Sequence, residues 1–458
     1  MHHPIQTIHS GKHPAMNSEP HFGRSLRAEL SDWQIWQTRV VVLAFAALSG
    51  LTVVAFTWLT EHALAGFFRA HAALPWLPLI WTPLCTALVV WATRRWAPGA
   101  AGSGIPQVMA ALHPHTPPRL RGLYVSIRLT IAKMLLTATG LLGGLSLGRE
   151  GPSVQIAAGV MHSARRWLPA NSAVQDHGLL IAGGAAGIAA AFNTPLGGIM
   201  FAIEELSRRP EQRSNGLVMS AIVLAGLIGI SAYGNSTYFG VIRVEPVSLA
   251  LLWPGLLLAV ACGLAGGLFA RLLSLSLSGT STDRFTAWRQ RHPIRFAAGC
   301  GLAVAVIGLA SAGSTFGSGY AHTKAMLDNG GDPSGLYVLL KFMATWLTAW
   351  SGVPGGIFAP SLAIGGALGS DIAHLTGHLD TPTLIALGMA GFLAAVTQAP
   401  MTAFIIVMEM VDGYSLVLSL MASAMVASAV SRLVSRPLYT VLADLQLKRL
   451  PAQPAQPF

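Results

Sequence analysis

The chain has 458 residues, of which 53% are hydrophobic and 10% are charged, and its mean hydropathy is +0.56. Soluble globular proteins do not have this balance, so the composition excludes them and predicts a polytopic membrane protein. The net charge of +11 does not indicate a nucleic-acid-binding protein, because the cations are dispersed over loops and termini without a basic and aromatic module.

The first 37 residues are polar and precede the apolar part of the chain. They carry five histidines that could form a metal-binding tail, but these lack ligand spacing, so we expect a disordered tail. The five are His2, His3, His9, His13 and His21. The first apolar span begins near Arg39, too far into the chain for a cleaved signal peptide. We expect spans near residues 39–60 and 77–93.

Basic residues flank the membrane region at both ends, and the positive-inside rule therefore predicts that both termini are cytoplasmic. The flanking residues are Lys12, Arg24 and Arg27 before the first span and Arg432, Arg436, Lys448 and Arg449 at or after the last. The number of crossings is then even. Uncharged runs such as 214–242 and 342–370 are each long enough to cross a bilayer core of about 30 Å.

A glycine-rich motif stands just before an apolar segment, at Gly102-Ser103-Gly104-Ile105-Pro106. Two glycines around a serine allow backbone and hydroxyl to approach a small ligand closely at a helix start. A helix cap or a simple turn explains the same residues. The motif alone leaves both interpretations open.

Lys133 lies in an apolar run, where an intramembrane ammonium needs a reason. One interpretation is that it supplies a positive field to a central anion. The other is that its side chain extends to the membrane surface. The sequence does not decide between them.

The most informative stretch is 143–160, which contains Gly148-Arg149-Glu150-Gly151-Pro152. Its glycines and proline predict a tight turn followed by a helix start, whose free N–H groups surround Glu150 and favour anions. A carboxylate held there can occupy an anion site and release it when it moves away or is protonated. Alternatively, Arg149 and Glu150 merely pair with each other or cap the helix.

Residues 178–206 are rich in small side chains, which favours close helix packing in lipid, and they end on Glu204-Glu205. Adjacent carboxylates at the end of an apolar helix, followed by Arg208 and Arg209, are candidates for a proton entry point on the cytoplasmic side. An ordinary charged helix end is the alternative.

The second half of the chain repeats the first. Three aligned pairs occur in the same order, namely 102–112 with 317–327, 148–159 with 356–367, and 195–206 with 400–411. Pro152 falls on Pro360, and Glu204 falls on Glu409. We therefore expect a first membrane repeat at 38–243, a second at 244–445, and a short cytoplasmic tail at 446–458.

Duplicated halves with Gly- and Pro-interrupted segments in matching places indicate a transporter whose substrate is held by helix ends near the midplane. The second copy of the central motif, Gly356-Ile357-Phe358-Ala359-Pro360, lacks the glutamate. Its N–H groups would face the same site as a neutral, anion-binding partner of Glu150. The two motifs together would form an anion pathway in which the Glu150 carboxylate competes with the transported anion.

Four motifs in this order resemble the signature set of the CLC family of chloride channels and proton/chloride antiporters. They are GSGIP at 102–106, GREGP at 148–152, GIFAP at 356–360, and Tyr439 within RPLYTVL. The resemblance covers about residues 35–445. It implies an all-α polytopic membrane protein with an inverted-repeat bundle of about eighteen tilted and part-spanning helices. It also implies a homodimer with an independent pathway in each subunit, located in the inner (plasma) membrane of the cell.

The resemblance also implies roles for individual residues. The hydroxyls of Ser103 and Tyr439 would hold a central chloride and close its cytoplasmic side. The backbone N–H groups of Ile357 and Phe358 would complete the site. Glu150 would be the external gate that competes with chloride and carries a proton.

For the proton route, Glu205 resembles the internal proton-transfer glutamate of many antiporters of the family, and Glu204 would assist at the water side. Passive channels of the family generally lack an acid at the position of Glu205. The resemblance therefore favours proton-coupled chloride exchange over a passive, voltage- or pH-gated chloride channel.

The expected partners are chloride and other small anions, protons and membrane lipid, and no cofactor or nucleic acid is expected. An intramembrane enzyme would need more than Glu150, Glu204 and Glu205. No metal constellation or nucleophile–base pairing accompanies these three glutamates, so we expect no enzymatic or metal site.

Overall fold

The computed structural model describes most of the chain. The described residues are 32–170, 172, 174–207, 216–234, 238–240, 249–279, 283–329, 335–377 and 380–448. The five N-terminal histidines, Arg208 and Arg209, and the expected boundary between the two repeats after residue 243 lie outside these residues.

The described residues form eighteen α-helices, labelled α2 to α19, and one isolated β-bridge. The first half contains α2 (Trp33–Ala73), α3 (Pro78–Trp96), α4 (Ile105–Leu112), α5 (Ile127–Leu142), α6 (Glu150–Ser163), α7 (Asp176–Phe192), α8 (Pro195–Phe201) and α9 (Gly216–Tyr233). The second half contains α10 (Leu252–Ser278), α11 (Arg284–Arg291), α12 (Pro293–Ala310), α13 (Tyr320–Asn329), α14 (Gly335–Ser351), α15 (Phe358–Thr376), α16 (Thr381–Thr397), α17 (Pro400–Met410), α18 (Val417–Val434) and α19 (Leu438–Leu447).

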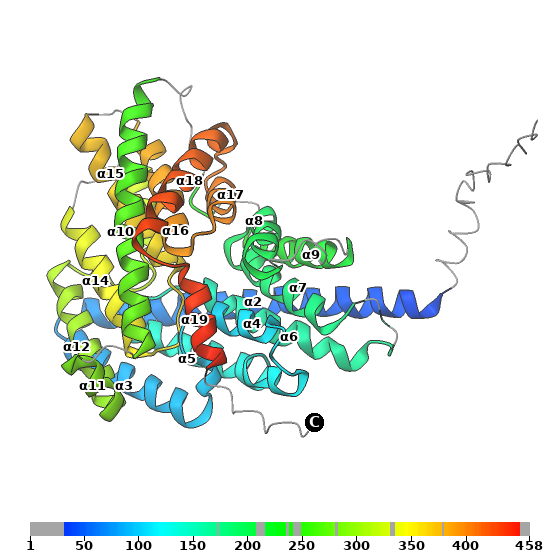
Figure 1. Cartoon of the computed structure of the whole chain (residues 1–458). Helices are drawn as coiled ribbons and strands as arrows, with labels where there is room; N and C mark the ends of the chain where they lie inside the picture. Colours follow the sequence, from blue (N-terminus) through cyan, green and yellow to red (C-terminus); the bar gives the residue numbers. More distant parts are fainter. Residues whose placement is uncertain are drawn as a thin grey trace, which may run out of the picture.

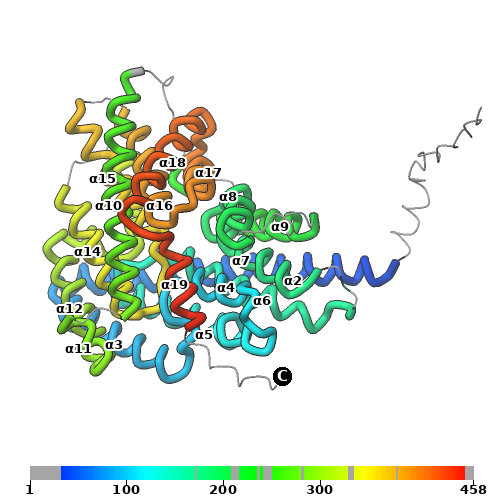
Figure 2. Tube along the Cα trace, viewed as in Figure 1, coloured from blue at the N-terminus to red at the C-terminus, as the bar shows by residue number. Residues whose placement is uncertain are grey.

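Six helical segments are long and apolar enough to cross a membrane, and several others are too short. This mixture confirms the expected multi-pass bundle of spanning and part-spanning helices. The longest is α2, which has 41 residues and is drawn as one continuous tube in Figure 2. It begins at Trp33, where Asp32 caps it by accepting a hydrogen bond from Gln34 N at 2.9 Å. The boundary expected after residue 37 therefore lies inside this helix.

Two segments that read as continuous apolar runs are broken in the structure. The run 342–370 does not cross as one helix, because α14 ends at Ser351 and α15 begins only at Phe358. The small-residue stretch 178–206 is divided between α7 and α8, followed by a π-helical turn at Ala202–Ser207. Uncharged length alone cannot predict such breaks, since the turn glycines and prolines that cause them are also apolar.

The two halves lie side by side, and each half has a helix that packs against the other half. Figure 1 shows α6 to α9 grouped on one side and α10 with α14 to α18 on the other. However, α3 of the first half packs against α12 of the second, and α19 of the second packs against α4 of the first. The halves therefore form one interlocked body rather than two separate domains.

Glycines allow the central helices to cross closely in both halves. A Cβ on Gly187 of α7 would collide with the backbone of Ser153 in α6, and a Cβ on Gly365 of α15 would collide with the backbone of Gly388 in α16. Such close packing of small residues stabilises helix pairs in lipid, where no hydrophobic effect drives association. It also fixes where α6 and α15 begin.

Candidate functional site

The starts of α6 and α15 meet at the antiparallel bridge. Gly148 N donates to Gly356 O, and Gly356 N donates to Gly148 O, both at 2.8 Å. This reciprocal pair relates the two copies of the motif by an approximate two-fold rotation. Because α6 begins at Glu150 and α15 at Phe358, the unpaired N–H groups of both helix starts converge on one small volume. We call this volume the crossing point.

The Gly-Ser-Gly loop is tied to the crossing point. Gly355 N donates to Gly102 O at 3.1 Å, and Ser103 Oγ lies against Gly151. Gly102 and Gly104 have φ angles of +75° and +109°, which residues with side chains rarely adopt. Three sequence motifs therefore come together, each with a proline in the first turn of the helix that follows it. These prolines are Pro106, Pro152 and Pro360.

The Glu150 side chain is turned into the crossing point and is fully buried. One carboxylate oxygen, Oε2, lies so close to Gly148 that a Cβ on that glycine would collide with it. The N–H groups of Arg149 and Ala359 lie nearby, but neither carboxylate oxygen has a partner with hydrogen-bond geometry. A buried carboxylate without good partners is costly, so its hold on this position is weak.

Arg149 does not pair with Glu150. Its Nη1 donates to Glu61 Oε1 of α2 at 2.7 Å, and its guanidinium lies 5.9 Å from the centre of the Tyr238 ring. This geometry removes the alternative that Arg149 and Glu150 merely neutralise each other. It also reveals Glu61 as a site residue that the sequence did not indicate.

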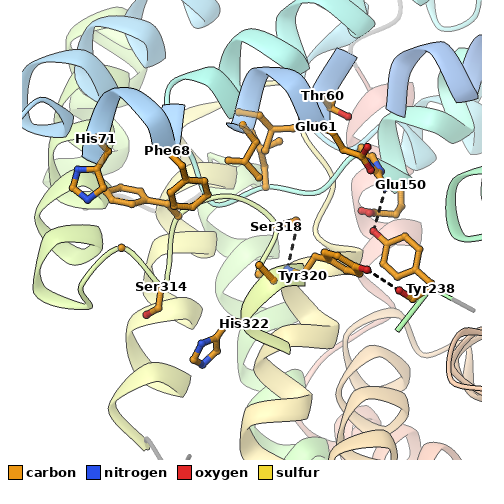
Figure 3. A pocket seen from close by; sticks show the side chains of 18 of the residues that line it. Thr60, Glu61, Phe68, His71, Glu150, Tyr238, Ser314, Ser318, Tyr320 and His322 are labelled. Atoms are coloured by element: carbon orange, nitrogen blue, oxygen red, sulfur yellow. Dashed lines mark hydrogen bonds and ion pairs between the residues drawn. The ribbon is translucent and has the colours of Figure 1, made fainter. Parts of the chain in front are cut away.

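A cavity of about 410 Å³ reaches the crossing point from one side, and we call it the Glu61 cavity. Glu61, Arg149 and Glu150 line it together with His71 and His322. Figure 3 shows Glu61, Glu150 and Tyr238 gathered at one end of this cavity, and His71 and His322 farther away. Glu150 thus forms part of the inner wall of the Glu61 cavity.

A second cavity, of about 100 Å³, is lined by Ser103, Ile357 and Tyr439. It also contains Arg289, and we call it the Arg289 cavity. The hydroxyls of Ser103 and Tyr439 lie close to each other, and both are buried without a hydrogen bond of good geometry. Two unpartnered hydroxyls at the start of α15 are suited to donate to an anion. The structure therefore brings these three predicted residues together.

Phe358 differs from the other predicted anion ligands because its side chain does not line the Arg289 cavity. Its ring packs at 5.9 Å from the Tyr439 ring, 6.5 Å from Phe201 and 6.3 Å from Phe192. Only its backbone N–H, at the first position of α15, faces the crossing point. This aromatic packing fixes the position of Tyr439 relative to the start of α15.

Lys133 is fully buried in α5 and does not extend to a membrane surface. Its Nζ donates to Ala100 O at 2.7 Å and to Gly102 O at 2.6 Å. The second half contains the same arrangement, because Lys341 Nζ donates to Thr315 O at 2.9 Å and to Gly317 O at 2.8 Å. Each lysine fixes the loop before α4 or α13 by donating to two of its carbonyl oxygens. The repeat in the sequence indicates a shared role, because Lys341 is the residue of the second half that aligns with Lys133.

Glu204 and Glu409 form a reciprocal pair of helix caps. Glu204 accepts hydrogen bonds from Met401 N at 3.2 Å and Thr402 N at 2.7 Å, at the start of α17. Glu409 accepts from residues 196 and 197 at the start of α8, at 3.1 and 2.7 Å. Carboxylates at helix starts are stabilising. These contacts give Glu204 a helix-capping role, and they do not test the expectation that it assists proton transfer.

The surroundings of Glu205 differ from those of its neighbour Glu204. It lies in the π-helical turn at Ala202–Ser207, is 5% exposed, and is close enough to Tyr439 for electrostatic interaction. Phe201, one turn earlier, contacts Phe358 at the crossing point. Glu205 is thus on the buried side of the same turn whose other carboxylate caps α17.

Comparisons with known proteins agree with this architecture. The sequence profile of the family described as voltage gated chloride channel matches residues 85–432. The H(+)/Cl(-) exchange transporter ClcA of Cronobacter sakazakii is 32% identical, over 92% of this chain and 93% of that protein. The protein of the same name from Salmonella typhimurium is 30% identical, over 92% of each chain.

Solved structures of similar fold include a slow cyanobacterial Cl-/H+ antiporter, with a TM-score of 0.78 and 26% identity over 90% of this chain and 98% of that one. A CLC-type fluoride/proton antiporter shares the fold, with a TM-score of 0.73 and 21% identity over 90% of this chain and 99% of that one. The chain therefore belongs to the voltage gated chloride channel family, the CLC family that its motifs resemble.

Proposed function

We propose that this protein exchanges chloride for protons across the inner membrane of the cell. One observation carries the proposal: the Glu150 carboxylate fills the crossing point, fully buried and without well-formed hydrogen bonds, between two cavities. An anion that takes this place gains the helix-start N–H groups and displaces the carboxylate. The displaced carboxylate then gains stability by binding a proton, which couples the two ions.

The predicted anion ligands, Glu150 and Glu205 each have a task in this cycle. The Ser103 and Tyr439 hydroxyls and the N–H groups of Ile357 and Phe358 bind chloride next to the crossing point. Glu150 gates the Glu61 cavity, which faces the outside, and carries the proton on that side. Glu205 delivers the proton from the cytoplasmic side.

The exchange assignment is supported by the names of the relatives above and by the buried position of Glu205. The two cavities and the crossing point are built by one chain, so a homodimer would carry two independent pathways. Both termini are cytoplasmic in this proposal, in agreement with the flanking basic residues.

The test is proton uptake into liposomes that contain the purified protein, driven only by a chloride gradient. A potassium ionophore clamps the membrane voltage, so that protons cannot follow electrically. Uphill proton movement is the expected result. Chloride flux without proton movement would instead indicate a passive anion channel and would leave Glu205 without a role.

A further inference from the structure

Two carboxylates of the Glu61 cavity lie near one cation. Arg149 is followed in the chain by Glu150, and it interacts electrostatically with both Glu61 and Glu150. Its Nη1 nevertheless donates to Glu61 Oε1 at 2.7 Å, whereas Glu150 has no hydrogen bond of good geometry. The cation is therefore bound by α2 and not by the gate carboxylate next to it in the chain.

Tyr238 contacts the same guanidinium. Arg149 Nη2 donates to the Tyr238 hydroxyl at 3.4 Å, and the guanidinium lies 5.9 Å from the centre of the ring. Tyr238 is itself fixed by Tyr320, whose hydroxyl donates to Tyr238 O at 2.8 Å, as Figure 3 shows. Both terminal nitrogens of Arg149 thus have a partner among the residues that line the Glu61 cavity.

The pair formed by Arg149 and Glu61 is not part of the duplicated scaffold. In the second half, Ile357 takes the position of Arg149, and Phe358 takes that of Glu150. The cation is thus present only in the half that has the gate carboxylate. Glu61 is also the single acidic residue of α2, a membrane-spanning helix, and an ionisable residue in such a helix is a functional candidate.

The exposure of the two side chains shows which of them depends on the other. The Arg149 side chain is 12% exposed, and the Glu61 side chain is 52% exposed. A largely buried cation is costly without a counter-charge, whereas a half-exposed carboxylate keeps part of its hydration. If Glu61 lost its charge, Glu150 would be the remaining carboxylate that interacts with Arg149. A charge-assisted pair between Arg149 and Glu150 would then hold the gate in the crossing point.

We infer that Glu61 is a positioning residue, which draws the Arg149 cation away from Glu150 and thereby lets the gate bind a proton and leave the crossing point. The inference rests on the proposed function, because it takes Glu150 as the protonatable gate. It deepens that function by assigning a task to a residue outside the four family motifs. Glu61 acts through Arg149, and it neither binds the transported anion nor carries the transported proton.

The surroundings of Glu150 determine the sign of this effect. The ionisable side chains that interact with its carboxylate are Arg149, Tyr238 and, on α19, Tyr439. The start of α15 and the Gly-Ser-Gly loop contribute no charged side chain, and tyrosines are neutral near pH 7. Removing the Glu61 charge therefore leaves an unmatched cation beside Glu150, which opposes protonation. A more acidic solution is then needed to open the gate.

The first test is equilibrium exchange of radioactive chloride in liposomes, measured from acidic to neutral pH with the same pH and chloride on both sides. This assay needs no defined orientation of the protein. Wild-type exchange should rise as the pH falls, because the gate is then protonated. In Glu61→Gln, half-maximal exchange should require a proton concentration about tenfold higher, with the maximal rate unchanged. A profile identical to that of the wild-type protein would overturn the inference.

The matched controls lie at the same position and on the same helix. Glu61→Asp keeps the charge and should restore most of the wild-type pH profile. Arg69, also on α2, is exposed and does not line the Glu61 cavity, so Arg69→Gln should leave the profile unchanged. A shift in Arg69→Gln equal to that in Glu61→Gln would overturn the inference, since the effect would then not depend on contact with Arg149.

A second test removes the cation. In an Arg149→Gln protein, the additional change Glu61→Gln should produce no further shift, because Glu61 acts only through Arg149. An equal shift with and without Arg149 would contradict the positioning role. Thermal unfolding in detergent measures the stability of each variant. A Glu61→Gln protein that lost stability while its pH profile stayed in place would show a purely structural role and would also contradict the inference.

Failure of the proposed function has a different signature. If Glu150→Gln exchange had the same pH dependence as the wild-type protein, Glu150 would not be the protonatable gate. If Glu150→Gln abolished the pH dependence while Glu61→Gln left the profile in place, the proposed gate would stand and the role of Glu61 alone would be wrong.

Discussion

The two halves of the molecule share a scaffold but differ at a few positions, and the differences coincide with the candidate site. Lys133 is matched by Lys341, and Glu204 is matched by Glu409. Their backbone hydrogen-bond partners occupy equivalent positions in the two halves. Glu150, in contrast, is matched by Phe358 in the repeat.

The second unmatched carboxylate is Glu205, whose counterpart after Glu409 is Met410. Met410 is buried in the apolar core. Duplicated charged residues therefore hold loops and helix starts in both halves. Glu150 and Glu205 are not duplicated in the repeat, and these are the two carboxylates that we assign to proton transfer.

The largest effect is expected from Glu150→Gln. The amide keeps the size of the side chain but cannot bind and release a proton, so proton coupling should be lost and chloride flux should become independent of pH. Parallel chloride and proton flux recordings in liposomes measure both effects. Proton pumping that persists in this variant would contradict the assignment of the gate.

Glu205→Val tests the second unmatched carboxylate. We expect chloride movement to continue while proton movement falls below detection, because Glu205 does not line the Arg289 cavity. Met410→Leu, at the repeat-related position, should leave both fluxes unchanged. If Glu205→Val kept its proton flux, the proton would use another route.

Ser103 and Ser318 occupy the same position in the two copies of the Gly-Ser-Gly motif, but their surroundings differ. The Ser318 hydroxyl accepts a hydrogen bond from Tyr320 N at 3.3 Å, whereas the Ser103 hydroxyl makes no hydrogen bond of good geometry. Ser103→Ala should weaken chloride binding by about 1 kcal/mol, the usual contribution of one hydrogen bond. Ser318→Ala should weaken it less. Titration calorimetry with chloride compares them, and equal losses would remove the distinction.

Glu409→Gln should have the smallest effect on transport. An amide cannot satisfy two backbone N–H donors as a carboxylate does, so we expect a loss of stability of about 1–3 kcal/mol. The ratio of chloride to protons should remain that of the wild-type protein. Thermal unfolding in detergent and the liposome assay measure the two properties. A changed ratio would mean that duplicated carboxylates also take part in coupling.

The motifs predicted much of the fold and the central site, because they are local. Gly, Pro and Ser at fixed spacing specify turns and helix starts, and the repeat identified which starts face each other. The antiparallel bridge between Gly148 and Gly356 and the burial of Glu150 agree with that prediction.

Long-range contacts were not predictable from one sequence. The pairing of Arg149 with Glu61 joins α6 to a residue 88 positions earlier, with no motif around Glu61. The helix-capping contact of Glu204 was also not predictable, because the start of α17 that it caps lies 198 positions later in the chain.

The most direct measurement compares the neighbours Glu204 and Glu205. Chloride and proton uptake are recorded simultaneously in liposomes containing Glu204→Gln or Glu205→Gln protein, after both variants are shown to be folded. The account predicts wild-type proton coupling and lower thermal stability for Glu204→Gln, and lost coupling for Glu205→Gln. Lost coupling in Glu204→Gln together with retained coupling in Glu205→Gln would contradict the division between structural and proton-carrying carboxylates.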